Sequence, residues 1–203
     1  MKRKLTLRQI TLTGLMAAAV YVASAFLQIP IPTAIDNTRL HMGNVMCLLS
    51  GLLLGPWQGG LAAGIGSMFF DLTNPAYIAS APFTFLFKFL MVWACGKIAF
   101  LSDSASPKPE CGTDTPSRLM TQNIMPRRSI RFLTSALCGS ALYVILYLSK
   151  SFAEHYFVLN LPLEAVLLTL SQKAIVSSVN AVVAVCVAVP LGLSLGPVIR
   201  KFT

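Results

Sequence analysis

Six stretches of the sequence are almost free of charged residues and are long enough, or nearly so, to cross a membrane. They cover residues 9–28, 41–55, 57–73, 83–101, 130–150 and 165–190. A helix of about 20 apolar residues spans the ~30 Å hydrocarbon core of a bilayer. The second stretch is short and the last is too long, so we expect the last helix to tilt, kink or begin at the membrane surface. The pattern predicts an all-α integral membrane protein with six transmembrane helices.

The segment of residues 102–129 interrupts this pattern because it is rich in Ser, Pro and Thr. Such a composition is typical of a flexible linker. The linker separates the first four predicted spans from the last two without adding a second folded unit, so we expect a single membrane domain over residues 1–203. The sequence shows no internal repeat strong enough to indicate an inverted-repeat transporter.

Basic residues gather at three places that six spans would put on one side of the membrane. They are Lys2, Arg3, Lys4 and Arg8 before the first span, Lys108, Arg118, Arg127, Arg128 and Arg131 around the linker, and Arg200 and Lys201 at the end of the chain. By the positive-inside rule this side is cytoplasmic. We therefore predict that the N and C termini and the linker lie in the cytoplasm, and that residues 30–40, 74–82 and 150–162 lie outside.

The first residues also fit a cleavable signal peptide, since a basic start and an apolar middle lead to small residues at 23–25. Against this interpretation, polar residues at 9–13 dilute the apolar middle, and the apolar character continues to Ile29. Multi-span proteins also seldom need a removable signal. We expect a retained first span in the multi-pass membrane protein.

The composition agrees with a membrane protein and argues against several other classes. The chain is 55% hydrophobic and 11% charged, and its net charge of +9 marks membrane sides rather than a nucleic-acid surface. The only two histidines, His41 and His155, lack the spacing of metal ligands, so we expect no metal and no other cofactor. The sequence contains no P-loop, and Gly64-x-Gly66 lacks the third glycine of a dinucleotide loop. We expect no catalytic residue.

Polar residues recur at helical spacing near one end of five spans. A charged group costs about 2.5–3.5 kcal/mol at the centre of a bilayer on insertion scales, so it needs a partner, water or a ligand. With the predicted orientation these residues share the outer level of the membrane, where we expect a substrate pocket. The candidate substrate-binding residues are Arg39, His41, Asn44, Asp71, Asn74, Tyr77, Thr84, Lys88, Tyr143, Tyr147, Lys173, Ser177 and Asn180.

An alternative is that these polar groups serve only the fold. Tyrosines mark the headgroup level of many membrane proteins, and Asn74 before Pro75 is typical of a turn. Asp71 and Lys88 could neutralise each other, either in a pocket wall or as a structural pair that pins the third and fourth spans together. The sequence alone leaves both interpretations open.

The segment "RLHMGNVMCLLSGLLLGPWQGGLAAGIGSMFFDLTNPAYIASAPFTFLFKFLMVWACGKIA", the six short spans and the basic ends resemble the substrate-binding S component of energy-coupling factor (ECF) transporters. These are vitamin uptake systems of prokaryotes, and the resemblance is strongest over residues 9–101. It implies a six-helix protein of the cell membrane that captures a vitamin outside and docks onto a transmembrane T component carrying two ATPases. The family's Ala-x-x-x-Ala docking motif fits Ala19 and Ala23.

This resemblance implies a binding subunit, with ATP hydrolysed by its partners. A stand-alone secondary carrier and an intramembrane enzyme or assembly factor remain open. The first external loop, with Asp36, Asn37 and Arg39, is either a lid or a rigid connector. The charges predict a mixed or slightly positive pocket, suited to a neutral, zwitterionic or anionic ligand. Tyrosines there could stack on a heterocycle, and riboflavin-like, pyridoxine-like, pyrimidine-precursor and pantothenate-like molecules all fit.

Overall fold

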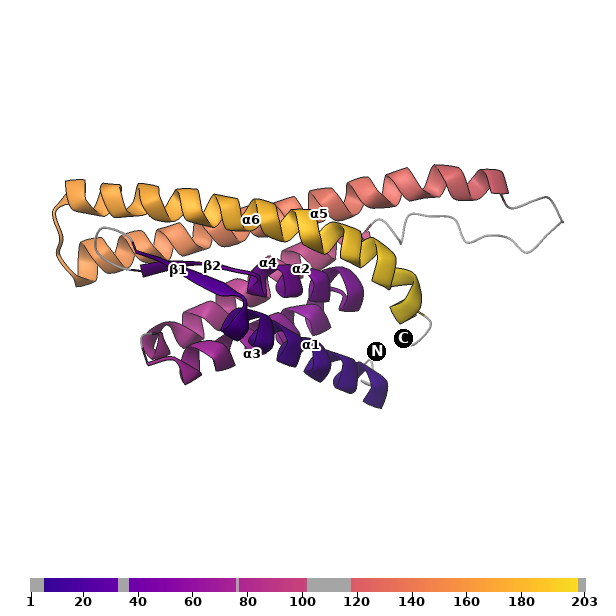
Figure 1. Ribbon diagram of the computed structural model, residues 1–203, viewed down its shortest axis with the longest axis horizontal. Coiled ribbons are helices and arrows are strands. Elements are labelled where there is room, and N and C mark those ends of the chain that lie inside the picture. Colours follow the sequence, from indigo (N-terminus) through magenta and orange to yellow (C-terminus); the bar gives the residue numbers. More distant parts are fainter. Residues whose placement is uncertain (1–5, 33–36, 76, 102–117, 201–203) are drawn as a thin grey trace.

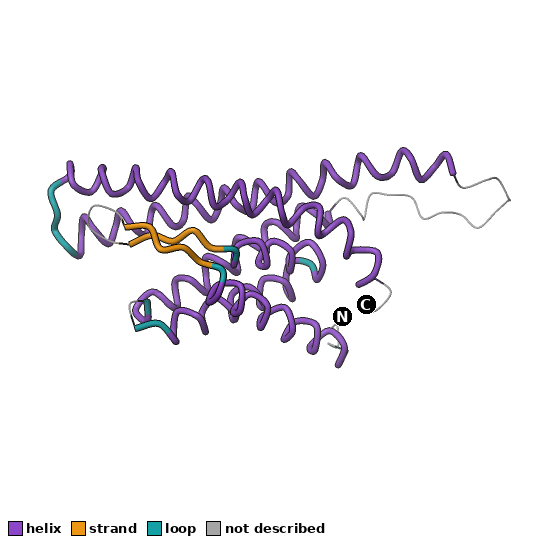
Figure 2. Tube along the Cα trace, in the orientation of Figure 1, coloured by secondary structure: helices purple, strands orange, loops and turns teal. Residues whose placement is uncertain are grey.

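The computed structural model describes residues 6–32, 37–75, 77–101 and 118–200, which form six α-helices and one β-hairpin (Figure 1). The helices are α1 (Leu7–Phe26), α2 (Gly43–Leu54), α3 (Pro56–Thr73), α4 (Ala81–Leu101), α5 (Arg118–Ala153) and α6 (Leu163–Arg200), and the strands are β1 (Gln28–Pro32) and β2 (Asn37–His41). A 3₁₀ turn, η1 (Ile78–Ser80), precedes α4, and a π-helical turn, η2 (Glu154–Val158), follows α5. Figure 2 shows that helices dominate the described chain, as the sequence predicts.

Four helical segments of the described chain are long and apolar enough to cross a membrane. They are Leu7–Phe26, Ile78–Phe100, Ser129–Val158 and Leu163–Gly196. Helix α2 is apolar but has 12 residues, which at 1.5 Å per residue is about 18 Å. Helix α3 has 18 residues, but its glycines, Gln58 and Asp71 make it less apolar. The six predicted helices are confirmed, whereas six complete spans and the sidedness of the termini stay predictions.

Close helix contacts hold the first four helices together. Helix α3 lies along both α1 and α4, and α2 packs against α3 and α6. A Cβ atom at Gly66 of α3 would lie 2.4 Å from the Ala17 carbonyl oxygen of α1, so only glycine permits this approach. The turn between α2 and α3 is made by Gly55 at φ 84°, and Pro56 then starts α3.

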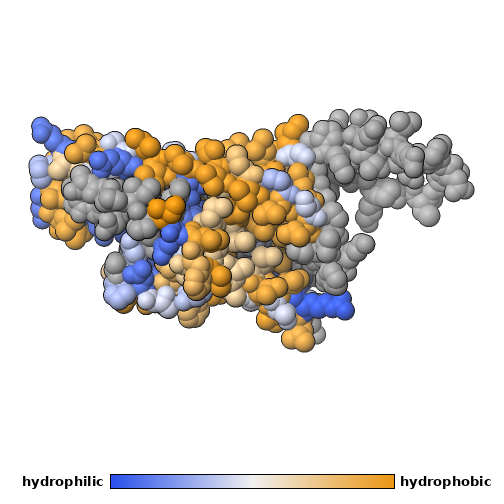
Figure 3. All heavy atoms as spheres, viewed as in Figure 1, coloured by the Kyte–Doolittle hydropathy of each residue, from blue (hydrophilic) through white to orange (hydrophobic). Residues whose placement is uncertain are grey.

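The apolar core draws on all six described helices and includes Leu48, Met91, Phe132 and Val185. Many large apolar side chains lie on the outer surface, among them Leu15, Phe69, Leu86, Ile145 and Ile175. Figure 3 shows this apolar surface over the middle of one face, with hydrophilic residues at both ends. This distribution is the one expected of helices that face hydrocarbon along their length and water at their ends.

The first loop forms an antiparallel hairpin, with register from Gln28↔His41 to Pro32↔Asn37. Next to this ladder, the Met42 N–H donates to the Leu27 carbonyl at 3.0 Å. Because hydrogen-bonded pairs alternate with unbonded ones, Pro30 and Pro32 fall at unbonded positions, where a missing N–H costs nothing. Strand β2 contacts α6. The hairpin tip, residues 33–36, lies outside the described residues, so the lid prediction stays a prediction.

Part of the predicted linker is helical, and the rest is not described. Residues 102–117 lie outside the described residues, whereas residues 118–129 are helical and form the first turns of α5. The linker prediction is therefore wrong for residues 118–129. Most of the Ser and Pro that predicted a linker lies in 102–117, while Leu119, Met120, Gln122 and Met125 are good helix formers.

Candidate functional site

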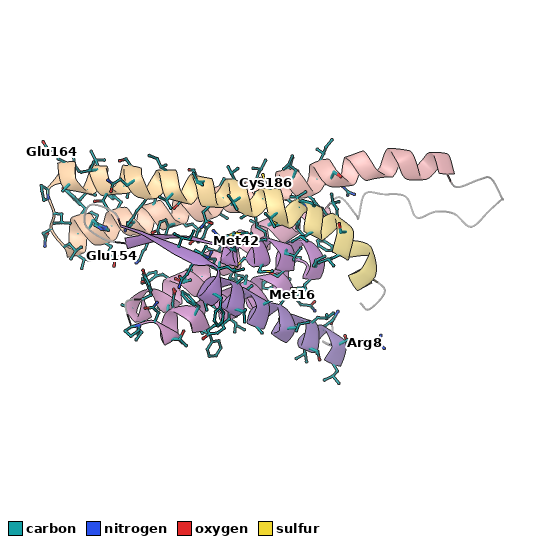
Figure 4. All side chains as sticks on the ribbon, in the orientation of Figure 1. Arg8, Met16, Met42, Glu154, Glu164 and Cys186 are labelled. Carbon is teal, nitrogen blue, oxygen red and sulfur yellow. The ribbon has the colours of Figure 1, made fainter. Side chains whose placement is uncertain are left out.

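A cavity of about 390 Å³ opens between the helices, within the usual range of small-molecule sites. Several of its residues belong to η1 and to the end of α5, which lie at the end of the molecule opposite the chain termini (Figure 1). Figure 4 shows Glu154 at this end and Arg8 at the other. The cavity is lined by Ser24, His41, Ser67, Phe70, Asp71, Tyr77, Ser80, Phe83, Thr84, Phe87, Lys88, Tyr143, Tyr147, Lys150, Ser151, Glu154, His155, Leu159, Lys173, Ser177 and Asn180.

The structure brings together most of the predicted pocket residues, which come from helices far apart in the sequence. Helical spacing placed them on common faces, and the packing of α3, α4, α5 and α6 turns these faces toward one another. Their role in binding stays a prediction. The predicted residues that line the cavity are His41, Asp71, Tyr77, Thr84, Lys88, Tyr143, Tyr147, Lys173, Ser177 and Asn180.

Three predicted pocket residues are not among those that line the cavity. Asn44 is buried behind the wall, where its Oδ1 accepts a hydrogen bond from Lys88 Nζ. Asn74 caps the end of α3, and its carbonyl accepts the Tyr77 N–H at 2.9 Å, so it makes the turn that the alternative interpretation predicts. The side chain of Arg39 lies outside the described part of the chain.

Lys88 carries its charge into the protein, with a side chain only 2% exposed. Its Nζ bonds to Asn44 and lies 4.2 Å from the centre of the Tyr143 ring. A hydrogen bond to an amide oxygen and an aromatic face both stabilise a buried ammonium group. Asp71 is equally buried in the same cavity, and its neutralisation by Lys88 stays a prediction.

A second buried lysine belongs to a polar chain that joins α6 to α5. Lys173 Nζ donates to Ser151 Oγ at 3.1 Å, and the Ser151 carbonyl oxygen lies 2.7 Å from His155 Nδ1. The sequence interpretation missed Ser151 and His155 as pocket residues. Their signal was the i, i+4 series that runs from Tyr143 through Tyr147 to Ser151 and His155.

Aromatic side chains form the less polar part of the wall. The rings of Tyr143 and Tyr147 stack with centroids 6.1 Å apart and planes inclined by 15°. Phe70, Phe83 and Phe87 also line the cavity. The sequence interpretation missed these phenylalanines, because in a membrane helix an apolar side chain facing a ligand looks like one facing lipid.

The charges around the cavity are mixed, with a small positive excess. Lys88, Lys150 and Lys173 face Asp71 and Glu154 among the described lining residues. Lys150 and Glu154 form an ion pair of 2.5 Å at partly exposed positions, which contributes little to stability. The buried part of the wall therefore presents two ammonium groups and one carboxylate, a field that favours a neutral or anionic ligand over a cation.

The predicted docking residues on α1 differ in their surroundings. Ala23 is 3% exposed and so lies within the chain's own packing, whereas Ala19 is partly exposed. The covered methyl group of Ala23 argues against a direct contact there, and the docking role of both alanines stays a prediction. The small residues on the exposed face of α1 are Gly14 and Ala18.

Comparison with known proteins identifies the family of this chain. Residues 4–112 match the family described as "ECF-type riboflavin transporter, S component", which is more than half of the 203-residue chain. A 70-residue segment is 37% identical to an "Uncharacterized protein in gap 3'region" of Pyrococcus woesei and covers 34% of this chain and 45% of that protein. The chain thus matches less than half the length of this curated relative, and no solved structure matches it.

The family match includes α1 to α4 and ends before α5. The lysines and serines that α5 and α6 bring to the cavity lie beyond it, so their roles depend on geometry alone. With four helices in its described part that can cross a membrane, the chain is a multi-pass membrane protein that belongs to the family of S components of ECF-type riboflavin transporters.

Proposed function

We propose that this chain binds riboflavin, or a close flavin relative, in the cavity between α3, α4, α5 and α6, and releases it to a transport machinery. The observation that carries the proposal is the pair of buried lysines, Lys88 and Lys173, in a cavity that also has an aromatic wall. A buried ammonium group is costly in a membrane protein unless it serves a partner or a ligand. The family match supports riboflavin over the other vitamins that fit the charge pattern.

The chemistry of riboflavin fits the two kinds of wall. Its flat ring system suits the faces of Tyr143, Tyr147 and the nearby phenylalanines, and its ring carbonyls suit donors such as Lys173. Its hydroxyl-bearing side chain suits small polar groups, which Ser177 and Asn180 provide. These matches support a flavin more than pantothenate, which has no ring for the aromatic wall.

The second part of the proposal concerns delivery. As an S component, the chain passes its ligand through a T component driven by two ATPases, and it hydrolyses no ATP itself. Helix α1 supplies the docking surface, through the exposed small residues Gly14 and Ala18 together with Ala19. Small residues let helix backbones approach closely in lipid.

The test of ligand identity is direct. The full chain is purified in mild detergent, retained ligand is identified by mass spectrometry, and riboflavin is titrated by quenching of its fluorescence. We expect retained flavin and saturable quenching, with no competition by pyridoxine or pantothenate. Retention of another vitamin, together with no riboflavin binding, would refute the substrate assignment.

Three variants locate the site. Lys173→Met and Asn180→Ala each remove a hydrogen-bonding group from the cavity and should weaken riboflavin binding by about 1–3 kcal/mol. Asn74→Ala is the control, because this side chain is not among those that line the cavity, and it should bind normally. If all three folded variants bind riboflavin as tightly as the unmodified chain does, riboflavin binds elsewhere.

Reconstitution tests delivery. In proteoliposomes the chain alone should bind riboflavin without accumulating it, and uptake should require the T component, both ATPases and ATP. Accumulation by the chain alone, driven by an ion gradient, would show a stand-alone carrier instead.

A further inference from the structure

His155 holds an unusual position in the cavity wall. It lies in the π-helical turn η2, where the Leu159 N–H donates to the Glu154 carbonyl at 3.1 Å. Its side chain is 3% exposed, yet it lines the cavity. Single π-turns occur often at functional sites, because they re-aim side chains relative to a regular helix. The i, i+4 series from Tyr143 thus brings a buried imidazole to the cavity wall, at the start of this turn.

The hydrogen bonds of His155 define which ring nitrogen carries a proton. Nδ1 lies 2.7 Å from the Ser151 carbonyl oxygen, and a carbonyl can only accept, so Nδ1 is the donor. In a neutral imidazole the other nitrogen is then a bare acceptor. This Nε2 atom is buried and has no hydrogen-bond partner in the described structure. A buried polar atom without a partner costs free energy until a partner arrives.

Ser151 connects this acceptor to a donor. Its hydroxyl oxygen accepts from Lys173 Nζ at 3.1 Å, while its carbonyl holds His155. The cavity wall thus carries an imidazole acceptor and an ammonium donor that are joined through Ser151. A ligand that satisfies both must carry an N–H or O–H group beside an oxygen or nitrogen acceptor. A cyclic imide and a polyol both have this arrangement.

We propose that His155 is a specificity-determining residue, whose Nε2 accepts a hydrogen bond from an N–H or O–H group of the ligand. This inference rests on the proposed function and specifies what the site recognises. Riboflavin offers two such groups, the imide N–H of its ring and the hydroxyls of its side chain. The inference requires that one of them, and not only the flat ring, be recognised through His155.

The experiment is a set of thermodynamic cycles in detergent. Riboflavin, N3-methylriboflavin, which lacks the imide N–H, and lumiflavin, which lacks the hydroxyl chain, are titrated against the unmodified chain, His155→Phe and His155→Gln. The control is Ser140→Ala. Ser140 is also buried on α5 without a hydrogen-bond partner for its hydroxyl, but it lines a separate groove between α5 and α6. Melting temperatures without ligand are measured for every variant.

We expect His155→Phe to weaken riboflavin binding by about 5- to 150-fold. Its melting temperature should change little, since the loss of the Nδ1 hydrogen bond to the Ser151 carbonyl is offset by removal of the unsatisfied Nε2 atom. His155→Gln, which keeps an acceptor, should lose less, and Ser140→Ala should lose nothing. In the Phe variant, the preference for riboflavin over one of the two analogues should disappear. If the preference for riboflavin over N3-methylriboflavin is lost, the imide N–H is the group that donates to His155. If the preference over lumiflavin is lost, a hydroxyl of the side chain is that group.

Two results overturn the inference in different ways. If the unmodified chain binds riboflavin, but both His155 variants bind it equally well and keep both preferences, His155 does not recognise the ligand and the proposed function stands. If the unmodified chain does not bind riboflavin at all, the proposed substrate fails and this inference fails with it. If the Phe variant does not fold, His155→Leu, which also lacks an acceptor, takes its place in the same comparison of preferences.

Discussion

Replacing Asn44 with leucine should destabilise the chain through Lys88. Leucine fills a similar volume but removes the Oδ1 atom that accepts from the buried ammonium group. A hydrogen bond to a charged group contributes about 1.5–3 kcal/mol. For a chain of this size, 1 kcal/mol corresponds to about 2–4 °C in melting temperature. We therefore expect the melting temperature of Asn44→Leu to fall by about 3–12 °C.

The assay is thermal unfolding in detergent, followed by circular dichroism, with a double-mutant cycle as the control. Lys88→Met removes the charge that Asn44 serves, so Asn44→Leu should cost much less in that background. Riboflavin affinity of Asn44→Leu should also fall, because Lys88 would no longer be held against Tyr143. The reasoning is refuted if the Leu substitution lowers the melting temperature equally with and without Lys88, or does not lower it.

Three further predictions concern packing, docking and topology. Gly66→Ala should lower the melting temperature, because its Cβ would lie 2.4 Å from a backbone oxygen of α1, whereas Gly14→Ala, with no atom within 4 Å, should not; equal melting temperatures would contradict this contact. Ala18→Trp, at an exposed position, should abolish uptake by the reconstituted transporter and leave riboflavin binding intact; normal uptake would move docking off this face. A single cysteine at Ser106, in an otherwise cysteine-free chain, should resist impermeant thiol reagents in intact cells; labelling would reverse the proposed topology.

The apolar pattern predicted the helices well because lipid-facing helices need long uncharged runs. The predicted stretch 9–28 corresponds to α1 and 57–73 to α3, within two residues at each end. The β-hairpin was missed because Pro30 and Pro32 are typical of loops, and only the pairing register shows that their nitrogens face away from the partner strand. Local sequence carries helix periodicity but not the register between two strands.

The candidate site was predictable to the level of helix faces and no further. Helical spacing placed Asn44 and Lys88 on polar faces. It could not show that Lys88 lines the cavity while Asn44 lies behind it and accepts its hydrogen bond. At the end of α5 and the start of η2, Lys150 and Glu154 line the cavity at partly exposed positions, where they pair with each other. The neighbouring series reaches a more buried part of the wall, since Ser151 and His155 are both 3% exposed. Depth within a bundle depends on how helices rotate against each other, and tertiary packing decides that rotation.

The division of the cavity between two parts of the chain has a consequence for specificity. Helices α3 and α4, inside the segment that matches the family, contribute Asp71 and Lys88, and Lys88 is anchored by Asn44 from α2. Helix α6 and the turn η2, beyond that segment, contribute Lys173 and the Nε2 acceptor of His155, which has no partner among the described residues. A charge that is already stabilised by the protein attracts many kinds of ligand. An unsatisfied hydrogen-bond acceptor, by contrast, disfavours every ligand that lacks a donor. Under the proposed function, discrimination among flavins should therefore depend more on α5, η2 and α6 than on the part of the chain by which its family is recognised.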